Sequence, residues 1–169
     1  MYKRYRLMFS FLGTMLCLAL LFYSCSEEED CSMTARPYMV CKFYQYGASK
    51  AIVRPDTLDF LTIRAIDTDS ILLNRGENVH MWEQALRYTQ SQTAFVLVYG
   101  QDPDADNVVK DTIWVKHENN SFFVSMDCGY QMRQNITAVS KYTQHRLDSV
   151  ALTNKEANYN GKENLKIIF

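Results

Sequence analysis

Most of the chain alternates between apolar and polar positions over short runs, and this period of two predicts half-buried β-strands. From Pro37 to Tyr46, for example, Met39, Cys41 and Phe43 share one face. Thr93–Tyr99 is apolar on both faces, which favours a central strand. The strands expected in this way cover residues 37–46, 57–66, 70–73, 93–99, 108–117, 121–128, 134–142, 148–153 and 165–169.

Two connections in this series carry specific expectations. Residues 108–117 and 121–128 are predicted to form a hairpin through Glu118-Asn119-Asn120. Within Val79–Tyr88, helical spacing of the apolar residues predicts one helical turn. About eight strands with frequent turn signals predict an all-β fold, an antiparallel β-sandwich of the immunoglobulin-like kind, with a barrel as the alternative. We expect a signal helix to precede it.

The first 24 residues have the layout of a secretory signal peptide. Lys3, Arg4 and Arg6 precede an almost wholly apolar run, Leu7–Tyr23. An uncleaved anchor helix and a buried first helix of a cytosolic protein are the alternatives. The apolar run is short for a bilayer span, and it has no polar face to turn toward water.

Leu21-Phe22-Tyr23-Ser24-Cys25 resembles a bacterial lipobox, in the looser form used by bacteria of the Bacteroidales type. The motif predicts that Cys25 is the lipidation site and that the protein is held to a membrane through a lipid anchor, since two or three acyl chains bind firmly. Ordinary signal cleavage, with Cys25 left as a free thiol, is the alternative.

Acidic residues follow the anchor at once, in Ser26-Glu27-Glu28-Glu29-Asp30. Anionic lipid repels such a run, so residues 25–35 are predicted to form a solvated tether, and residues 36–169 the β-sandwich domain. The run also resembles the tag that sends lipoproteins of such bacteria to the outer face of the outer membrane. We therefore expect an outer-membrane, surface-exposed protein of the cell envelope, with a periplasm-facing lipoprotein as the alternative.

Beyond the tether, the chain has as many basic as acidic residues. Nucleic-acid binding usually needs a basic field, so the neutral body argues against nucleic-acid partners. It gives no reason to expect electrostatic docking on anionic lipid either.

Candidate chemistry is sparse. Asp102, Asp104 and Asp106 resemble the start of a calcium loop, although Asn107 replaces the expected glycine and Ile113 the bidentate glutamate. A solvated connection is the alternative. No catalytic motif is found, and the three histidines are far apart, so we predict no catalytic residue and no cofactor other than weakly bound calcium. A dispersed Ser-His-Asp site stays open, because triads are spatial.

Hydroxyl residues recur after aspartate and before an aliphatic residue, as in the O-glycosylation site of exported Bacteroidales proteins. The four candidates are Thr57, Ser70, Thr112 and Ser149. A turn followed by the start of a strand explains the same pattern. The face formed by Tyr38, Tyr44 and Tyr46 predicts either simple packing or a surface that binds a glycan or a partner.

Several short segments, in their order along the chain, resemble an uncharacterised family of Bacteroidales lipoproteins that is catalogued only as a domain of unknown function. They are Cys31 with Pro37, Asp69-Ser70-Ile71, Cys128-Gly129, Asp148-Ser149-Val150 and Glu163–Phe169. The Leu-Pro-Leu segment usual in that family is absent from residues 79–88. The resemblance implies a compact, mostly β body and no established activity.

Three cysteines remain once Cys17 has left with the signal and Cys25 carries lipid. An oxidising compartment allows one disulfide and one leftover thiol. Strand parity places both Cys41 and Cys128 toward the core, so that pair is sterically conceivable. The family pattern implies a Cys31–Cys128 disulfide instead.

We therefore expect a non-enzymatic, lipid-anchored envelope protein that acts as a binding or assembly accessory, with an envelope protein or a glycan as its partner. A calcium-stabilised adhesion-type module and an envelope hydrolase with a dispersed site are the alternatives.

Overall fold

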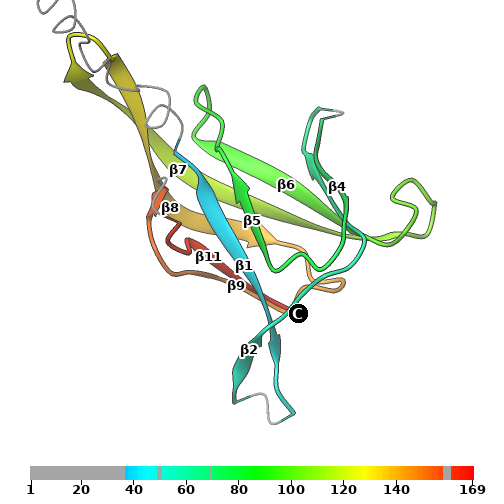
Figure 1. Ribbon diagram of the computed structural model, residues 1–169. Helices are drawn as coiled ribbons and strands as arrows, with labels where there is room; N and C mark the ends of the chain where they lie inside the picture. Colours follow the sequence, from blue (N-terminus) through cyan, green and yellow to red (C-terminus); the bar gives the residue numbers. More distant parts are fainter. Residues whose placement is uncertain (1–36, 49–50, 69, 158–160) are drawn as a thin grey trace, which may run out of the picture. The chain divides into compact units, whose positions relative to one another are not determined.

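A computed structural model of the protein describes residues 37–48, 51–68, 70–157 and 161–169. All of them lie within one compact unit, Cys31–Phe169. They form eleven strands arranged in two sheets, which confirms the predicted all-β sandwich (Figure 1). No helix in this part of the chain is long and apolar enough to cross a bilayer. The predicted signal helix lies outside the described residues.

The larger sheet has six strands, and it contains the strongest sequence signal. Its order is β10 (Glu156–Ala157), β8 (Gly129–Tyr142), β7 (Val109–Ser125), β6 (Gln92–Tyr99), β3 (Leu61–Ala65) and β4 (Ile71–Gly76). Every pair in it is antiparallel. β6 lies between β7 and β3, and this central position, which the sequence predicted, accounts for its two apolar faces.

The smaller sheet is built around β1 (Met39–Tyr46). Its order is β2 (Val53–Pro55), β1, β11 (Leu165–Ile168) and β9 (Ser149–Leu152), and β5 (Met81–Gln84) also pairs with β1. The β1–β11 pair is parallel, with Cys41 opposite Leu165, and all its other pairs are antiparallel. One parallel pair therefore departs from a purely antiparallel arrangement.

The hydrophobic core lies between the two sheets and follows the predicted strand parity. Met39, Cys41 and Phe43 are at most 1% exposed. Aromatic rings meet edge to face across the core, with ring centroids 4.7 Å apart for Trp82 and Phe95 and 5.8 Å apart for Tyr99 and Phe169. Such pairs add to the stabilisation that the burial of apolar area supplies.

The predicted turn at Glu118-Asn119-Asn120 is wrong. These residues lie inside β7, which runs without interruption for 17 residues, and they pair with Asn135, Gln134 and Arg133 of β8. The chain turns at residues 126–128 instead, and Gly129 follows with φ of 63°. β7 and β8 therefore form one long hairpin whose end extends beyond the sandwich (Figure 1).

The predicted helical turn within Val79–Tyr88 is also wrong. Residues 81–84 form β5, which pairs with β1 from Gln84 opposite Met39 to Met81 opposite Lys42. Trp82 is buried against Phe95, so the strand places its largest side chain in the core. Pairing with β1 and burial of Trp82 outweigh a weak local preference for helix.

Candidate functional site

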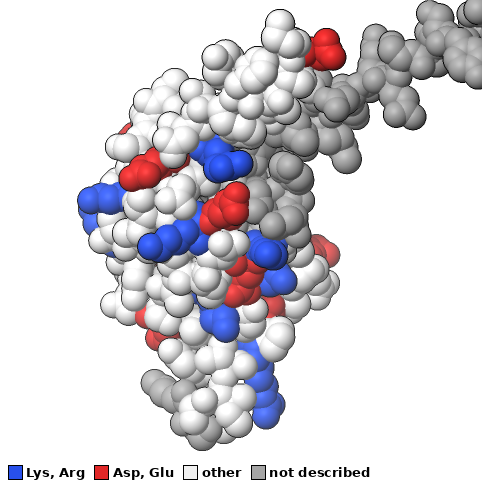
Figure 2. All heavy atoms as spheres, turned by 90° about the vertical axis from the view of Figure 1, so that its left-hand side faces the viewer, with Lys and Arg blue, Asp and Glu red and all other residues white. Residues whose placement is uncertain are grey.

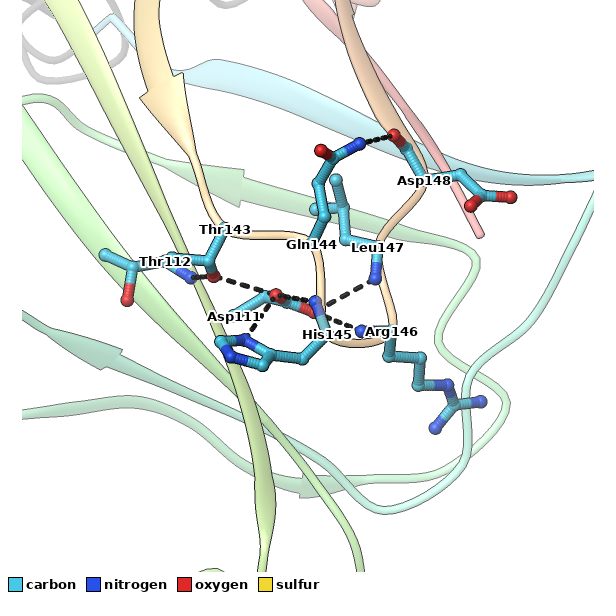
Figure 3. Close-up of polar contacts among 8 residues, drawn as sticks. All are labelled: Asp111, Thr112, Thr143, Gln144, His145, Arg146, Leu147 and Asp148. Carbon is cyan, nitrogen blue, oxygen red and sulfur yellow. Dashed lines mark hydrogen bonds and ion pairs between the residues drawn. The ribbon is translucent and has the colours of Figure 1, made fainter.

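Asp111 holds the loop between β8 and β9 through the densest group of polar contacts around one carboxylate in the described residues (Figure 3). Its side chain is fully buried. One carboxylate oxygen accepts hydrogen bonds from the Thr143 hydroxyl at 2.7 Å and the His145 backbone N–H at 2.8 Å. The other accepts the backbone N–H groups of Arg146 at 2.9 Å and Leu147 at 3.0 Å. The loop is thereby fixed against β7.

These contacts determine the charge state of Asp111. Burial alone would raise its pKa, but the hydrogen bonds from His145, Arg146, Thr143 and Leu147 outweigh burial and hold the pKa below its usual range. The carboxylate is therefore ionised at neutral pH, which is the form that accepts all these donors.

His145 lies beside this carboxylate, with Nδ1 at 3.3 Å from Asp111 Oδ1. An Asp–His pair is two thirds of a hydrolytic triad. Within the described residues, however, no serine, threonine or cysteine hydroxyl or thiol hydrogen-bonds to the His145 ring, and the backbone donors already occupy Asp111. The contacts that the structure shows for Asp111 are those that hold the loop.

A second histidine, His117, has a triad-like arrangement but is 2% exposed. Its Nε2 lies 2.8 Å from the Thr93 hydroxyl, and its Nδ1 lies 3.1 Å from Asn119 Oδ1. Asn119 Oδ1 can only accept, and it also accepts from Gln134 Nε2. The Nδ1 of His117 therefore carries the proton, and its Nε2 accepts from the Thr93 hydroxyl. Thr93 in turn accepts the Arg87 backbone N–H at 3.0 Å. A substrate has no access to this Thr93 hydroxyl, which is itself buried.

Asn119 connects this network to the segment before β6. Its Nδ2 lies 3.0 Å from the carbonyl oxygens of Arg87 and Tyr88 and 2.7 Å from that of Gln90. Gln134 adds a bond from its Nε2 to the Leu86 carbonyl at 3.1 Å. Residues 86–90 are thus fastened to β7 and β8 at the level where the hairpin leaves the sandwich. We call this group the His117 network.

The His117 network predicts a loss of stability in mild acid. Burial lowers the pKa of His117, because a charged ring is costly there. As pH falls through 6.5, the unfolded chain takes up a proton that the folded protein resists, so the free energy of unfolding decreases. Asp111 has a lowered pKa, so the stability that it supplies is lost only below about pH 4, in the range where unfolded aspartates titrate.

Urea unfolding of the wild type and of His117→Gln, each at pH 7.5 and pH 5.0, measures this effect. We expect the wild type to lose more stability between these pH values than the variant does. Equal losses would show that His117 is not the group responsible.

An open hollow of about 450 Å³ lies on the outward face of the six-stranded sheet. Its lining consists of Arg64, Ala65, Ile66, Asp67, Thr68, Ile71, Val96, Val98, Asp104 and Lys110. Across its rim, Arg64 pairs with Asp104 at 2.6 Å. Its lining combines apolar side chains with charges of both signs, so its charge favours neither an anion nor a cation.

One residue of the predicted calcium loop, Asp104, lines this hollow. Asp102 accepts the Asp104 backbone N–H at 3.1 Å, and the Asp104 carboxylate pairs with Arg64, which lowers the Asp104 pKa. In the described ranges, no group of three His, Cys, Asp or Glu side chains is gathered closely enough to hold a metal ion. Asp102, Asp104 and Asp106 are therefore not brought together, and calcium binding stays a prediction.

The other predicted sites divide by accessibility. Of the four hydroxyl residues proposed for O-glycosylation, Thr57 and Ser70 are exposed, while Thr112 and Ser149 are half-buried within strands. The tyrosine face is partly used for packing, because Tyr44 donates to Glu163 and lies under Lys166. Glycosylation itself stays a prediction.

The free thiol of Cys41 rules out one of the two candidate disulfides. Cys41 is a free, fully buried cysteine, so the Cys41–Cys128 pairing is wrong. Burial, and secondarily the nearby Glu163, raise the pKa of the Cys41 thiol far above its usual range, which makes it unreactive. Cys25 and Cys31 lie outside the described residues, and the Cys31–Cys128 disulfide stays a prediction.

The sequence contained an overlooked signal for Asp111 and His117. Both share the inward parity of Ile113 and Val115 along β7, and polar residues on a core face must find partners. The identity of those partners depends on loops far away in sequence.

Comparison with known proteins places the chain in a family but assigns no activity. No curated protein and no solved structure matches it. Residues 60–169 match the model of a family described as a family of unknown function, DUF6452. This match covers more than half of the chain, and the protein therefore belongs to DUF6452.

Proposed function

We propose that the protein is a lipid-anchored lipoprotein of the cell envelope whose β-sandwich acts as a non-enzymatic binding or assembly module. The proposal of a non-enzymatic role is supported by the way in which the buried titratable and amide side chains are used. Asp111, His117 and Asn119 are engaged in hydrogen bonds that hold loops to strands. A site for catalysis would instead direct such groups into an accessible cleft.

The first part of the proposal rests on the sequence. A basic and apolar leader, the lipobox at Cys25 and the acidic run after it occur in the order needed for export, lipidation and display. The finer proposal is that the family includes lipoproteins of bacteria of the Bacteroidales type. We further propose the outer face of the outer membrane as the location and a Cys31–Cys128 disulfide as the link between the tether and the body.

The hollow beside Arg64 is the surface that we propose for a partner of this module. Its lining combines apolar side chains with the paired charges of Arg64 and Asp104, features that suit an uncharged polar ligand such as a glycan, or a polar protein loop. In the view of Figure 2, basic and acidic side chains are interspersed over the face of the body. Such a surface offers no large field of one sign to steer a highly charged partner.

Substitution of the proposed lipidation site tests the anchor. We expect Cys25→Ala to abolish incorporation of labelled palmitate and to release the protein from the membrane fraction, because the acyl chains supply the attachment. Ser26→Ala changes the next residue and keeps the cysteine, so it should keep both the label and the membrane fractionation. Membrane association of Cys25→Ala equal to that of the wild type would refute the proposal.

A further inference from the structure

The tip of the long hairpin, residues 121–132, exposes an unusual group of apolar side chains. Among the nine exposed large hydrophobic residues of the described chain, four are located here: Phe123 at 51%, Val124 at 38%, Met126 at 90% and Tyr130 at 76%. Phe123 and Tyr130 face each other across the two strands, with ring centroids 5.5 Å apart. Asp127 is the single charged residue of the tip. In Figure 2, the corresponding upper end of the body shows little blue or red.

Among the described strands, only β7 and β8 form the tip. From Asn120 to Ser125, β7 pairs only with β8 among the described strands, and β10 joins β8 no nearer the tip than Gln134. Six residues of strand correspond to about 20 Å. The apolar end is therefore held away from the core, where it covers no other part of the described chain.

The chain enters the body at the base of this projection. Asn164 accepts the Val40 backbone N–H at 2.8 Å and donates to the Glu156 carbonyl at 2.8 Å. Glu156 belongs to β10, whose Ala157 pairs with Gln134 of the hairpin. The start of β1 therefore lies level with the place where the hairpin leaves the sandwich, as Figure 1 also shows. A tether arriving at β1 pulls on the end of the body that carries the tip.

We propose that the hairpin tip lies in the interfacial region of the membrane to which the lipid anchor holds the protein. This inference rests on the anchor at Cys25 proposed above. Pro37 lies twelve positions after Cys25, and a chain of that length reaches at most about 40 Å. That reach is of the same order as the projection of the hairpin. With the Cys31–Cys128 disulfide proposed above, the tip is joined to the chain only six positions after the lipid-bearing Cys25, a reach of at most about 20 Å.

The composition of the tip fits a lipid interface better than a second protein. Aromatic rings and methionine partition into the headgroup region, where a tyrosine hydroxyl stays hydrated. At about 200 Å² for a fully exposed large side chain, the four residues offer about 500 Å². A stable protein interface needs about 800 Å² on each partner. The tip itself has no lysine or arginine, and Arg133, which follows it, stacks on Phe122 and pairs with Glu156, so contact with lipid does not require anionic headgroups.

A fluorescent reporter at the tip tests the inference. Met126→Trp places an indole at the most exposed tip position, and Ile52→Trp places one at a site that is 56% exposed, next to β2 at the opposite end of the body. Each lipid-modified protein is incorporated into phosphatidylcholine vesicles with and without brominated acyl chains. Bromine quenches tryptophan only at contact distance. The wild type supplies the signal of Trp82 and Trp114 for subtraction.

We expect the bromolipid to quench the added emission of Met126→Trp at least about twofold and to leave that of Ile52→Trp unchanged. If both variants float with the vesicles and are quenched equally little, the tip does not touch lipid and only this inference fails. If the tip emission shifts to shorter wavelength without quenching, a second copy covers the tip, and the inference again fails. If the lipid-modified proteins do not float with the vesicles, the anchor itself fails.

Discussion

Replacing Asp111 with alanine is expected to lower the free energy of unfolding by about 3–4 kcal/mol, a large part of the total for a single domain. The substitution removes an ionised acceptor from the hydroxyl of Thr143 and the backbone N–H groups of His145, Arg146 and Leu147. Buried donors that lose their acceptor keep the full cost of desolvation. Urea unfolding followed by circular dichroism measures the change.

Asp148→Ala is the matched control, because its side chain is exposed at the end of the same loop (Figure 3). We expect it to change stability by less than about 0.5 kcal/mol. Asp111→Asn should fall between the two, since its amide keeps one acceptor but turns N–H groups toward the N–H groups of Arg146 and Leu147. A stability of Asp111→Ala within error of the control would show that the loop holds without the carboxylate.

Replacing Asn119 with alanine is expected to lower the free energy of unfolding by about 2–4 kcal/mol. Its side chain satisfies the carbonyl oxygens of Arg87, Tyr88 and Gln90 and accepts from His117 and Gln134. Truncation removes an acceptor from two buried side chains, His117 and Gln134. Native-state hydrogen exchange should show the loss first in residues 86–90, which the side chain fastens to the hairpin.

Asn120→Ala is the control for this second variant. Asn120 is the next residue of β7 and is exposed, so its side chain points away from the network. We expect a change below about 0.5 kcal/mol. If Asn120→Ala destabilised the protein as much as Asn119→Ala does, the effect would come from strand preference rather than from the network.

The fold was predictable where one local pattern is strong and no distant group competes with it. Thr93–Tyr99 is apolar on both faces and is indeed central in its sheet. Glu118-Asn119-Asn120 has the composition of a turn, but Asn119 uses its side chain for carbonyl oxygens about 30 residues earlier, and the strand continues. The helical turn expected around Trp82 was wrong for the same reason, because the pairing of β5 with the distant β1 decides the conformation there.

The candidate site was less accessible to prediction, because its geometry depends on contacts distant in sequence. Strand parity shows that Asp111 and His117 face the core, and it therefore shows that both need partners. It does not show that the partners of Asp111 are backbone groups of residues 145–147. It also does not show that the Asp104 carboxylate is paired with Arg64, since that contact joins β3 to the loop before β7.

The parallel pairing of β1 with β11 has a consequence for biogenesis. The central strand of the smaller sheet gains that neighbour only when residues 165–168 have been synthesised, more than a hundred positions later. A topology with such distant pairing folds slowly, since ordering the intervening chain costs entropy before the contact forms. The smaller sheet can therefore gain its parallel pair only after the strands of the larger sheet have been synthesised.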